Sequence, residues 1–190
     1  MNIGEAALIA ASGLWLALPA LLPNSAAVLF GGGTPIDMGR SWRGRRILGD
    51  GKTWTGFIGG AAAGIALGLI LIGVAVLAGW EDNGGFGPID QALGVITALS
   101  IGSLLGDMLG SFIKRRLGIP RGAKFPILDQ YDFLIGAFII VGICYPQWLY
   151  NSYLDGWRLL ALLTLLVATP LLHRLMNILG YRMGKKEVPW

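Results

Sequence analysis

The chain has 190 residues, of which 54% are hydrophobic and only 14% are charged, and its formal net charge is +4. Soluble domains carry about 25% charged residues, so this composition, with a mean hydropathy of +0.64, excludes a water-soluble globule and predicts an integral membrane protein. A single cysteine, Cys144, excludes an intrachain disulfide framework, and a single histidine, His173, excludes a histidine-rich metal site.

Five apolar segments are long enough to cross a bilayer, which takes about 20 helical residues. They cover residues 6–30, 57–80, 89–113, 128–150 and 157–179. Pro19 and Pro23 predict a break or bend in the first segment, because proline has no amide hydrogen to donate within a helix. That segment lacks a basic N-terminal region, so we interpret it as a retained helix and not as a cleaved signal peptide. We expect one all-α, membrane-embedded domain over residues 1–190 with five transmembrane helices.

The basic residues predict how these helices are oriented. All but one of the 15 lysines and arginines lie in residues 31–55, 111–127 and 174–190, and the exception is Arg158. Cytoplasmic loops of membrane proteins carry an excess of lysine and arginine. We therefore expect a multi-pass protein of the cell membrane with its N-terminus outside, its C-terminus in the cytoplasm and its basic loops on the cytoplasmic side.

Three aspartates lie in or beside apolar segments, where an aspartate at mid-span costs about 2.5–3.5 kcal/mol on insertion scales. Asp107 belongs to the third segment, and Asp129 and Asp132 begin the fourth. Because these two segments run in opposite directions, the carboxylates are expected to meet near the cytoplasmic boundary. Such a cluster favours a Mg²⁺ site for a polyphosphate. The alternative is a set of buried ion pairs with Lys114 and Arg115 that only holds helices together.

Helical spacing places more polar residues beside the first of these aspartates. Ser103, Asp107, Ser111 and Lys114 fall on one face of a helix, whereas Arg116 points about 180° away from Asp107. We expect Lys114 to contact phosphate and to take part in catalysis, and the two serines to form hydrogen bonds within the site.

Two rows of glycine at four-residue spacing predict close contacts between helices. The rows are Gly56, Gly60, Gly64 and Gly68 in the second segment, and Gly102, Gly106 and Gly110 in the third. They fit packing inside the bundle, and a homodimer face remains an alternative.

A glycine-rich basic loop over residues 37–54 is the second candidate for phosphate chemistry. Glycines flank Asp50 and Lys52, and Thr53 follows; glycine lets backbone amides approach an anion closely. The spacing is not that of a P-loop, and a basic loop lying on lipid headgroups is the alternative. Near the C-terminus, His173, Asn177 and Tyr181 form a helical stripe, in which we interpret His173 as a hydrogen-bonded structural residue.

Several of these motifs resemble one enzyme family. The run from Ser103 through Asp107, Ser111, Lys114 and Arg115, followed by Pro126-x-x-Asp129-x-x-Asp132, is similar to the signature of the CDP-diacylglycerol synthase superfamily. The short chain and the absence of a His-Gly-Gly segment before the final aspartate pair fit the archaeal branch, the CDP-archaeol synthases. Long motifs across nearly the whole chain resemble that branch: residues 43–46, 49–54, 111–118, 128–133 and 188–190.

The resemblance implies a Mg²⁺-dependent enzyme with five membrane helices. Members of that family transfer the cytidylyl group of CTP to 2,3-di-O-geranylgeranylglyceryl 1-phosphate, which gives CDP-archaeol and pyrophosphate. The resemblance assigns Mg²⁺ to Asp107, Asp129 and Asp132, and phosphate contacts to Lys114 and Arg115. It further places Asp50, Lys52 and Thr53 in a substrate-binding loop, and Ser103 and Ser111 beside the site. The expected partners are CTP, the ether-lipid phosphate and the bilayer, and no nucleic acid.

Two other classes of membrane protein remain alternatives. A transporter would carry polar residues to the bilayer midplane, often within inverted repeats, whereas here they crowd one boundary. A phosphotransferase that uses a CDP-lipid would carry the DGxxAR…GxxxDxxxD pattern, which this chain lacks.

Overall fold

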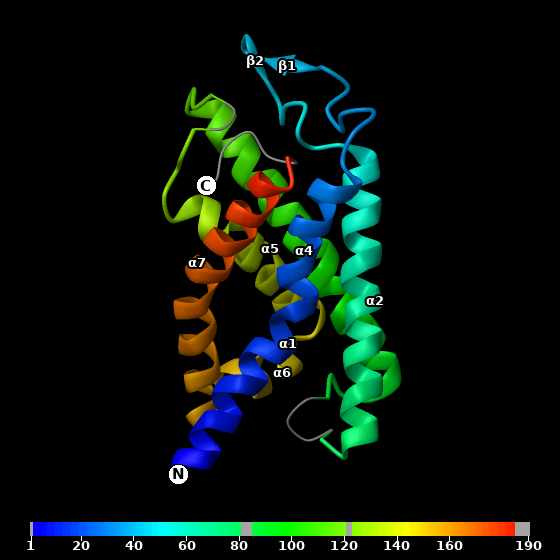
Figure 1. Ribbon diagram of the computed structural model, residues 1–190, viewed down its shortest axis with the longest axis vertical. Helices are drawn as coiled ribbons and strands as arrows, with labels where there is room; N and C mark the ends of the chain where they lie inside the picture. Colours follow the sequence, from blue (N-terminus) through cyan, green and yellow to red (C-terminus); the bar gives the residue numbers. More distant parts are fainter. Residues whose placement is uncertain (1, 81–84, 121–122, 185–190) are drawn as a thin grey trace.

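The computed structural model describes residues 2–80, 85–120 and 123–184 and shows a bundle of helices (Figure 1). The long helices are α1 (Ile3–Phe30), α2 (Trp54–Ala78), α4 (Ile89–Arg116), α5 (Leu128–Cys144) and α7 (Leu159–Arg182). Between α5 and α7 the chain forms α6 (Pro146–Leu149), the π-helical turn η1 (Tyr150–Leu154) and the 3₁₀ turn η2 (Gly156–Arg158). A small antiparallel hairpin, β1 (Ser41–Trp42) and β2 (Arg45–Arg46), lies between α1 and α2, with Ser41 opposite Arg46.

Four helices of the described chain are long and apolar enough to span a bilayer: α1, α2, α4 and the run from Gly156 through α7. This confirms the predicted all-α membrane architecture. The fourth predicted segment is different, because α5 has 17 residues and ends at Cys144, where the sequence predicted a helix to residue 150. Pro146 explains the end, since a proline disfavours helical conformation in the residue before it, and Tyr145 has φ −137° and ψ 55°. A fifth crossing stays a prediction.

Of the break or bend predicted in the first segment, the break is wrong, because α1 is one helix with Pro19 and Pro23 inside it; a bend stays a prediction. Pro23 has no amide hydrogen for the carbonyl of Pro19, four residues earlier. The Ser100 hydroxyl of α4 lies 3.1 Å from that carbonyl and 2.7 Å from the carbonyl of Ile96, and Ser103 donates to the Ala20 carbonyl at 2.7 Å. Ser100 of α4 therefore satisfies the one carbonyl of α1 that Pro23 leaves without a donor, and Ser103 adds a second bond between the two helices.

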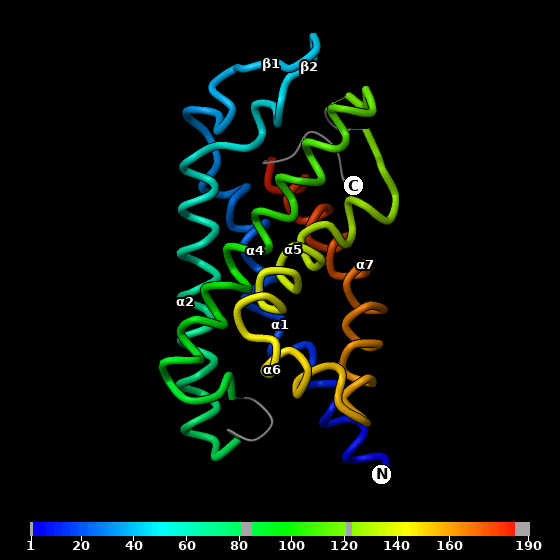
Figure 2. The backbone as a smooth tube through the Cα atoms, turned by 180° about the vertical axis from the view of Figure 1, so that it is seen from behind, coloured from blue at the N-terminus to red at the C-terminus, as the bar shows by residue number. Residues whose placement is uncertain are grey.

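The glycine rows pack inside the bundle, as one of the two readings of the sequence predicted. Figure 2 shows α4 and α5 side by side. A Cβ atom added at Gly136 of α5 would lie 2.4 Å from the Cα of Gly106, and one added at Gly106 would lie 2.2 Å from the carbonyl oxygen of Asp132. In α2, a Cβ at Gly64 would lie 2.9 Å from the Pro19 carbonyl oxygen. Helix backbones thus approach one another where only glycine fits.

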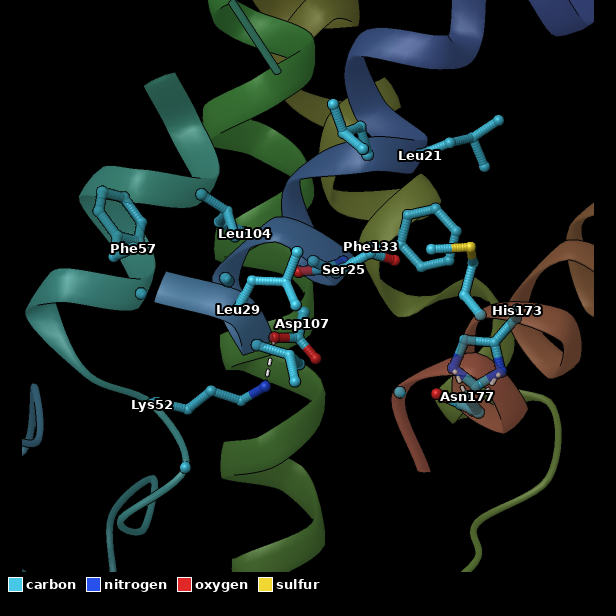
Figure 3. A pocket seen from close by; sticks show the side chains of 18 of the residues that line it. Leu21, Ser25, Leu29, Lys52, Phe57, Leu104, Asp107, Phe133, His173 and Asn177 are labelled. Atoms are coloured by element: carbon cyan, nitrogen blue, oxygen red, sulfur yellow. Dashed lines mark hydrogen bonds and ion pairs between the residues drawn. The ribbon is translucent and has the colours of Figure 1, made fainter. Parts of the chain in front are cut away.

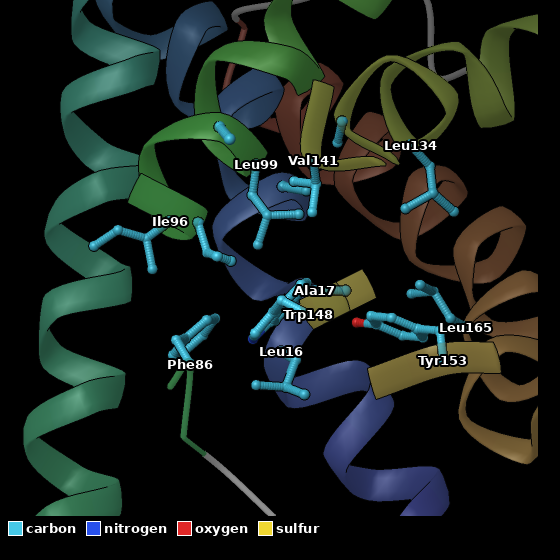
Figure 4. Close-up of a cluster of buried hydrophobic side chains, with 14 of the residues drawn as sticks. Leu16, Ala17, Phe86, Ile96, Leu99, Leu134, Val141, Trp148, Tyr153 and Leu165 are labelled. Atoms are coloured by element: carbon cyan, nitrogen blue, oxygen red, sulfur yellow. The ribbon is translucent and has the colours of Figure 1, made fainter. Parts of the chain in front are cut away.

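The apolar core occupies the half of the bundle away from the hairpin. Figure 4 shows side chains from α1, α4, α5, α6, η1 and α7 meeting there. Phe86 stacks on Trp148 with 6.1 Å between ring centroids, and the fully buried Tyr153 donates a hydrogen bond to the Gly13 carbonyl at 2.8 Å. The core therefore closes the end of the bundle at which α1 begins.

The basic segments gather at the opposite end. In Figure 1 the hairpin, the start of α2 and the last turns of α4 and α7 all lie at the top, and α1 begins at the bottom. Arg43, Arg45 and Arg46 lie at the hairpin, and Lys114, Arg115 and Arg116 lie in the last turn of α4. This grouping fits the predicted orientation. That the basic end faces the cytoplasm stays a prediction.

Labelling tests that orientation. In a Cys144→Ser background, we expect a cysteine at Asn151 to react with a membrane-impermeant maleimide in intact cells, because η1 lies at the end away from the basic segments. A cysteine at Ser41 should react only after permeabilisation. Reversed accessibility would place the hairpin outside the cell and contradict the prediction.

Alanine substitution tests the helix contact. Gly136→Ala forces a Cβ into the Gly106 backbone, and such overpacking costs about 1–3 kcal/mol. Gly73→Ala is the matched control, because a Cβ there meets nothing within 4 Å and a helical alanine is favoured over glycine by roughly 0.5–1 kcal/mol. We expect Gly136→Ala to lower the melting temperature in detergent and Gly73→Ala to leave it unchanged or raise it. Equal melting temperatures would contradict this account of the contact.

Candidate active site

One pocket of about 380 Å³ opens between α1, α2, α4, α5 and α7 (Figure 3). Much of its wall is aliphatic, and its polar lining includes Lys52, Asp107, Asp129, Asp132 and His173. Aliphatic side chains come mainly from α1; they are Leu18, Leu21, Leu22, Val28 and Leu29. The pocket therefore combines a charged region with an apolar one.

The three predicted carboxylates line this pocket together, as the antiparallel arrangement of α4 and α5 predicted. Asp107 projects from α4, and Asp129 and Asp132 project from the first turns of α5. Gly110 makes room for one of them, because a Cβ at that position would lie 2.1 Å from Oδ2 of Asp132. The sequence predicted this glycine as a packing residue, and it also accommodates an acidic side chain.

Lys52 forms an ion pair with Asp107 across the pocket (Figure 3). Two backbone hydrogen bonds close the base of its loop: the Ile36 amide donates to the Lys52 carbonyl at 2.8 Å, and the Trp54 amide donates to the Thr34 carbonyl at 3.2 Å. These bonds bring the end of the loop to α4. The predicted loop residue Lys52 and the predicted metal residue Asp107 thus belong to one site.

Thr53 also lines the pocket, yet its hydroxyl has a local function. It is the N-cap of α2 and accepts a hydrogen bond from the Gly56 amide at 3.2 Å. A threonine in this position satisfies an amide that has no partner within the helix. Asp50 does not line the pocket; its side chain is 62% exposed and pairs with Arg46 at 2.7 Å.

Lys114 is bonded to Asp129 and does not line the pocket. Its Nζ donates to both carboxylate oxygens of Asp129, at 2.9 and 3.0 Å, and to the Ala123 carbonyl at 2.9 Å. Asp129 also accepts from the Phe125 amide at 2.9 Å. Together these bonds attach the segment before α5 to the end of α4.

The other predicted site residues on α4 lie outside the pocket lining. Ser103 is bonded to α1, Ser111 is half-buried, and Arg115 donates to the Ile119 carbonyl at 2.5 Å. Arg116 does not line the pocket either.

Arg116 fastens the hairpin to α4. Its guanidinium donates to the carbonyls of Trp42, Arg45 and Arg46 at 2.6–3.0 Å. It also lies over the Trp42 ring, 5.2 Å from the centroid, and Trp42 stacks on Phe112. The sequence indicated only its direction and not this contact, because the hairpin and α4 are about 70 residues apart in the chain.

Asp37 fixes the shape of the loop, although no sequence motif pointed to it. Its buried carboxylate accepts from Arg46 at 2.7 Å and from the amides of Gly39, Leu48 and Gly49 at 2.9–3.1 Å. The hydrogen bond from Arg46 holds the pKa of Asp37 well below its usual range. The available signal was the spacing of Asp37 and Gly39, which fits an aspartate bonding its own backbone two residues on.

His173 and Asn177 of α7 form the far wall of the pocket. The Asn177 side-chain nitrogen lies 3.3 Å from the His173 ring, and Asn177 is buried. Tyr181, the third residue of the predicted stripe, is exposed. The stripe thus contributes two polar residues to the pocket, and His173 is hydrogen-bonded as predicted.

The donor set suits a hard divalent cation that arrives with phosphate. Within the described parts of the chain, no three histidine, cysteine, aspartate or glutamate side chains are arranged to hold a metal ion by themselves. Mg²⁺ in nucleotide sites is usually held by one or two carboxylates, with waters and substrate phosphates completing its shell. Asp107 and Asp132, on facing helices at the pocket, supply such a pair.

The helices are long and apolar enough to span a membrane, and acids and a lysine converge at one end of an apolar pocket. These features fit an intramembrane enzyme as the class of protein. The family model described as CarS-like, CDP-archaeol synthase, matches residues 6–190. A solved structure, described as an intramembrane enzyme for archaeal membrane lipids biosynthesis, is similar with a TM-score of 0.59 and 37% identity, over 88% of this chain and 94% of that one.

Curated relatives agree. CDP-archaeol synthase of Methanospirillum hungatei JF-1 is 49% identical over 91% of this chain and 99% of its own length. The enzyme of that name from Methanosarcina mazei is 44% identical over the same shares, and that from Halobacterium salinarum is 42% identical over 93% and 94%. The chain belongs to the CDP-archaeol synthase family and is a CTP-dependent nucleotidyltransferase of archaeal lipid biosynthesis.

Substitution of Asp37 tests the loop network. We expect Asp37→Asn to lower the free energy of unfolding by about 1–3 kcal/mol. The neutral amide cannot replace the buried carboxylate as the ion-pair partner of Arg46 and as the acceptor for the loop amides. Asp50→Asn, which removes the exposed partner of the same arginine, should cost less than about 1 kcal/mol.

The effect of Asp37 should depend on pH in one direction. Its folded-state pKa is depressed, so its stabilisation is complete above the unfolded carboxyl pKa and declines as the pH falls through the folded value. The difference in melting temperature between the wild type and Asp37→Asn should be constant from pH 5 to 8 and shrink below about pH 4. A difference that grows in acid would contradict the assignment.

Proposed function

We propose that this pocket catalyses Mg²⁺-dependent transfer of the cytidylyl group of CTP to 2,3-di-O-geranylgeranylglyceryl 1-phosphate. The products are CDP-archaeol and pyrophosphate. The observation that carries the proposal is the convergence of Asp107, Asp129, Asp132 and Lys52 at one end of a largely aliphatic pocket. The names of the curated relatives support the same reaction.

The reaction needs positioning and charge neutralisation more than proton transfer. A phosphate oxygen of the lipid attacks the α-phosphorus of CTP, a new P–O bond forms, and the bond to the β-phosphate breaks to release pyrophosphate. The lipid phosphomonoester is already an anion near neutral pH, so the attack requires no general base. Enzymes accelerate such transfers by orienting the reactants and by stabilising charge on the phosphoryl oxygens.

The residues divide this work between two regions of the pocket. Asp107, Asp129 and Asp132 would hold Mg²⁺, which would neutralise the triphosphate when bound. The Lys52 ammonium would contact a phosphate directly, and Lys114 would act through Asp129, whose carboxylate it holds by two hydrogen bonds. The aliphatic side chains of α1 would receive the isoprenoid chains beside the headgroup.

The geometry favours this reaction over a transport cycle. Transport sites lie near the bilayer midplane, whereas the acids of this pocket lie on the basic half of the bundle, and the opposite half is filled by apolar core. We place the site at the cytoplasmic face, where CTP is available, in a protein with five membrane-crossing helices and its N-terminus outside.

Amide substitutions test the proposal. Asp107→Asn, Asp129→Asn and Asp132→Asn should each reduce kcat/KM for CTP by about 10²–10³-fold, the effect of removing one preorganised charge-stabilising group. Asp90→Asn is the matched control, since Asp90 is exposed in the first turn of α4 at the other end of the bundle, and it should retain activity. Pyrophosphate release from CTP with the lipid phosphate measures each variant after size-exclusion chromatography. Near-normal activity in any two of the three variants would contradict the site.

A further inference from the structure

Two lysine–aspartate pairs flank the pocket, and they are built differently. Lys114 is on a helix, is 13% exposed at its side chain and donates to three oxygens from Asp129 and Ala123. Breaking that arrangement would release the segment before α5 from α4. The Lys114–Asp129 pair is therefore part of the scaffold of the site.

The Lys52–Asp107 pair has few other attachments. Lys52 lies in the loop before α2, and within the described chain Asp107 is the one hydrogen-bond partner of its Nζ. Both side chains are about one-quarter exposed, at 25% and 27%, and both line the pocket. The backbone of Lys52 is fixed by the Ile36 amide, so its side chain can turn while the loop stays in place.

Charge explains why this lysine faces an aspartate. Asp107 shares the pocket with Asp129 and Asp132, and these carboxylates repel one another. A nearby cation reduces that repulsion. Lysine suits an exchangeable role because its ammonium is a compact charge on a flexible stem, whereas arginine favours a fixed two-pronged contact.

We propose that Lys52 is a displaceable counterion, which neutralises Asp107 and transfers to a nucleotide phosphate when a divalent cation takes its place at that carboxylate. No covalent bond changes in this exchange. Asp107 has a positive partner before and after the exchange, and the nucleotide phosphate gains one. Because the cation alone must compete with Lys52, and the nucleotide offers the lysine a new partner, each ligand should strengthen binding of the other. The inference rests on the proposed function.

Binding measurements without turnover test the exchange. The full-length protein in detergent micelles is titrated with Mn²⁺, monitored by the EPR signal of the unbound ion, in the absence and presence of CTP and without lipid substrate. The variants are Lys52→Met and the control Lys124→Met. Lys124→Met removes the same charge from a lysine that does not line the pocket.

We expect Lys52→Met to bind Mn²⁺ about 10-fold more tightly than the wild type without CTP, a difference of about 1.4 kcal/mol. The gain in Mn²⁺ affinity that CTP produces in the wild type should largely disappear in this variant. Lys124→Met should bind Mn²⁺ within about threefold of the wild type. Lys52→Arg keeps the charge and favours a fixed two-pronged contact with Asp107, so it should bind Mn²⁺ no more tightly than the wild type. If Lys52→Met is not monodisperse, Lys52→Gln replaces it.

Three results would overturn the exchange. Lys52→Met could bind Mn²⁺ no more tightly than the wild type, Lys124→Met could gain as much affinity as Lys52→Met, or CTP could raise Mn²⁺ affinity equally in Lys52→Met and the wild type. Each leaves the proposed cytidylyl transfer intact if the wild type binds Mn²⁺ and is active. A wild type that binds no Mn²⁺ even with CTP would instead refute the proposed metal site, and the exchange with it.

Discussion

The arrangement of this protein depends on accommodating three aspartate side chains inside an apolar bundle. An unpaired ion in low-dielectric surroundings is expensive, and it persists where an opposite charge or a ligand compensates it. Here Lys52 and Lys114 reach two of the acids, from a loop and from a helix, while Gly110 gives the third a place against α4. The positions of the loop, of α4 and of α5 all follow from bringing these groups together.

The loop over residues 31–53 can supply its lysine because other residues fix its shape. Asp37 accepts hydrogen bonds from backbone amides of the loop and from Arg46, and Arg116 bonds the hairpin to α4. None of these residues lines the pocket. They hold the loop whose Lys52 pairs with Asp107, so much of the charge in this region is structural.

Local patterns predicted the membrane helices, the close glycine contacts and the meeting of the three aspartates. Those features follow from apolar length, four-residue spacing and the alternation of helix direction, which the sequence displays directly. The sequence could not show which lysine pairs with which aspartate, because Lys52 and Asp107 are 55 residues apart. It also failed at prolines: Pro146 ends α5 early, whereas α1 continues through Pro19 and Pro23, and Ser100 of a distant helix bonds the Pro19 carbonyl that Pro23 leaves without an amide donor.

The packed apolar core on the far side of the pocket has a consequence for the movement of lipids and ions across the membrane. On α4 the pocket is lined at Leu104, Asp107 and Met108, and a turn or two further down Val95, Ile96 and Leu99 are fully buried. A lipid headgroup that enters at the charged end therefore finds no continuous polar path to the opposite leaflet. Synthesis and translocation are separate tasks in such a design. In the proposed reaction the activated lipid would leave in the leaflet from which its precursor came, and the same packing would prevent the charged pocket from leaking ions across the membrane.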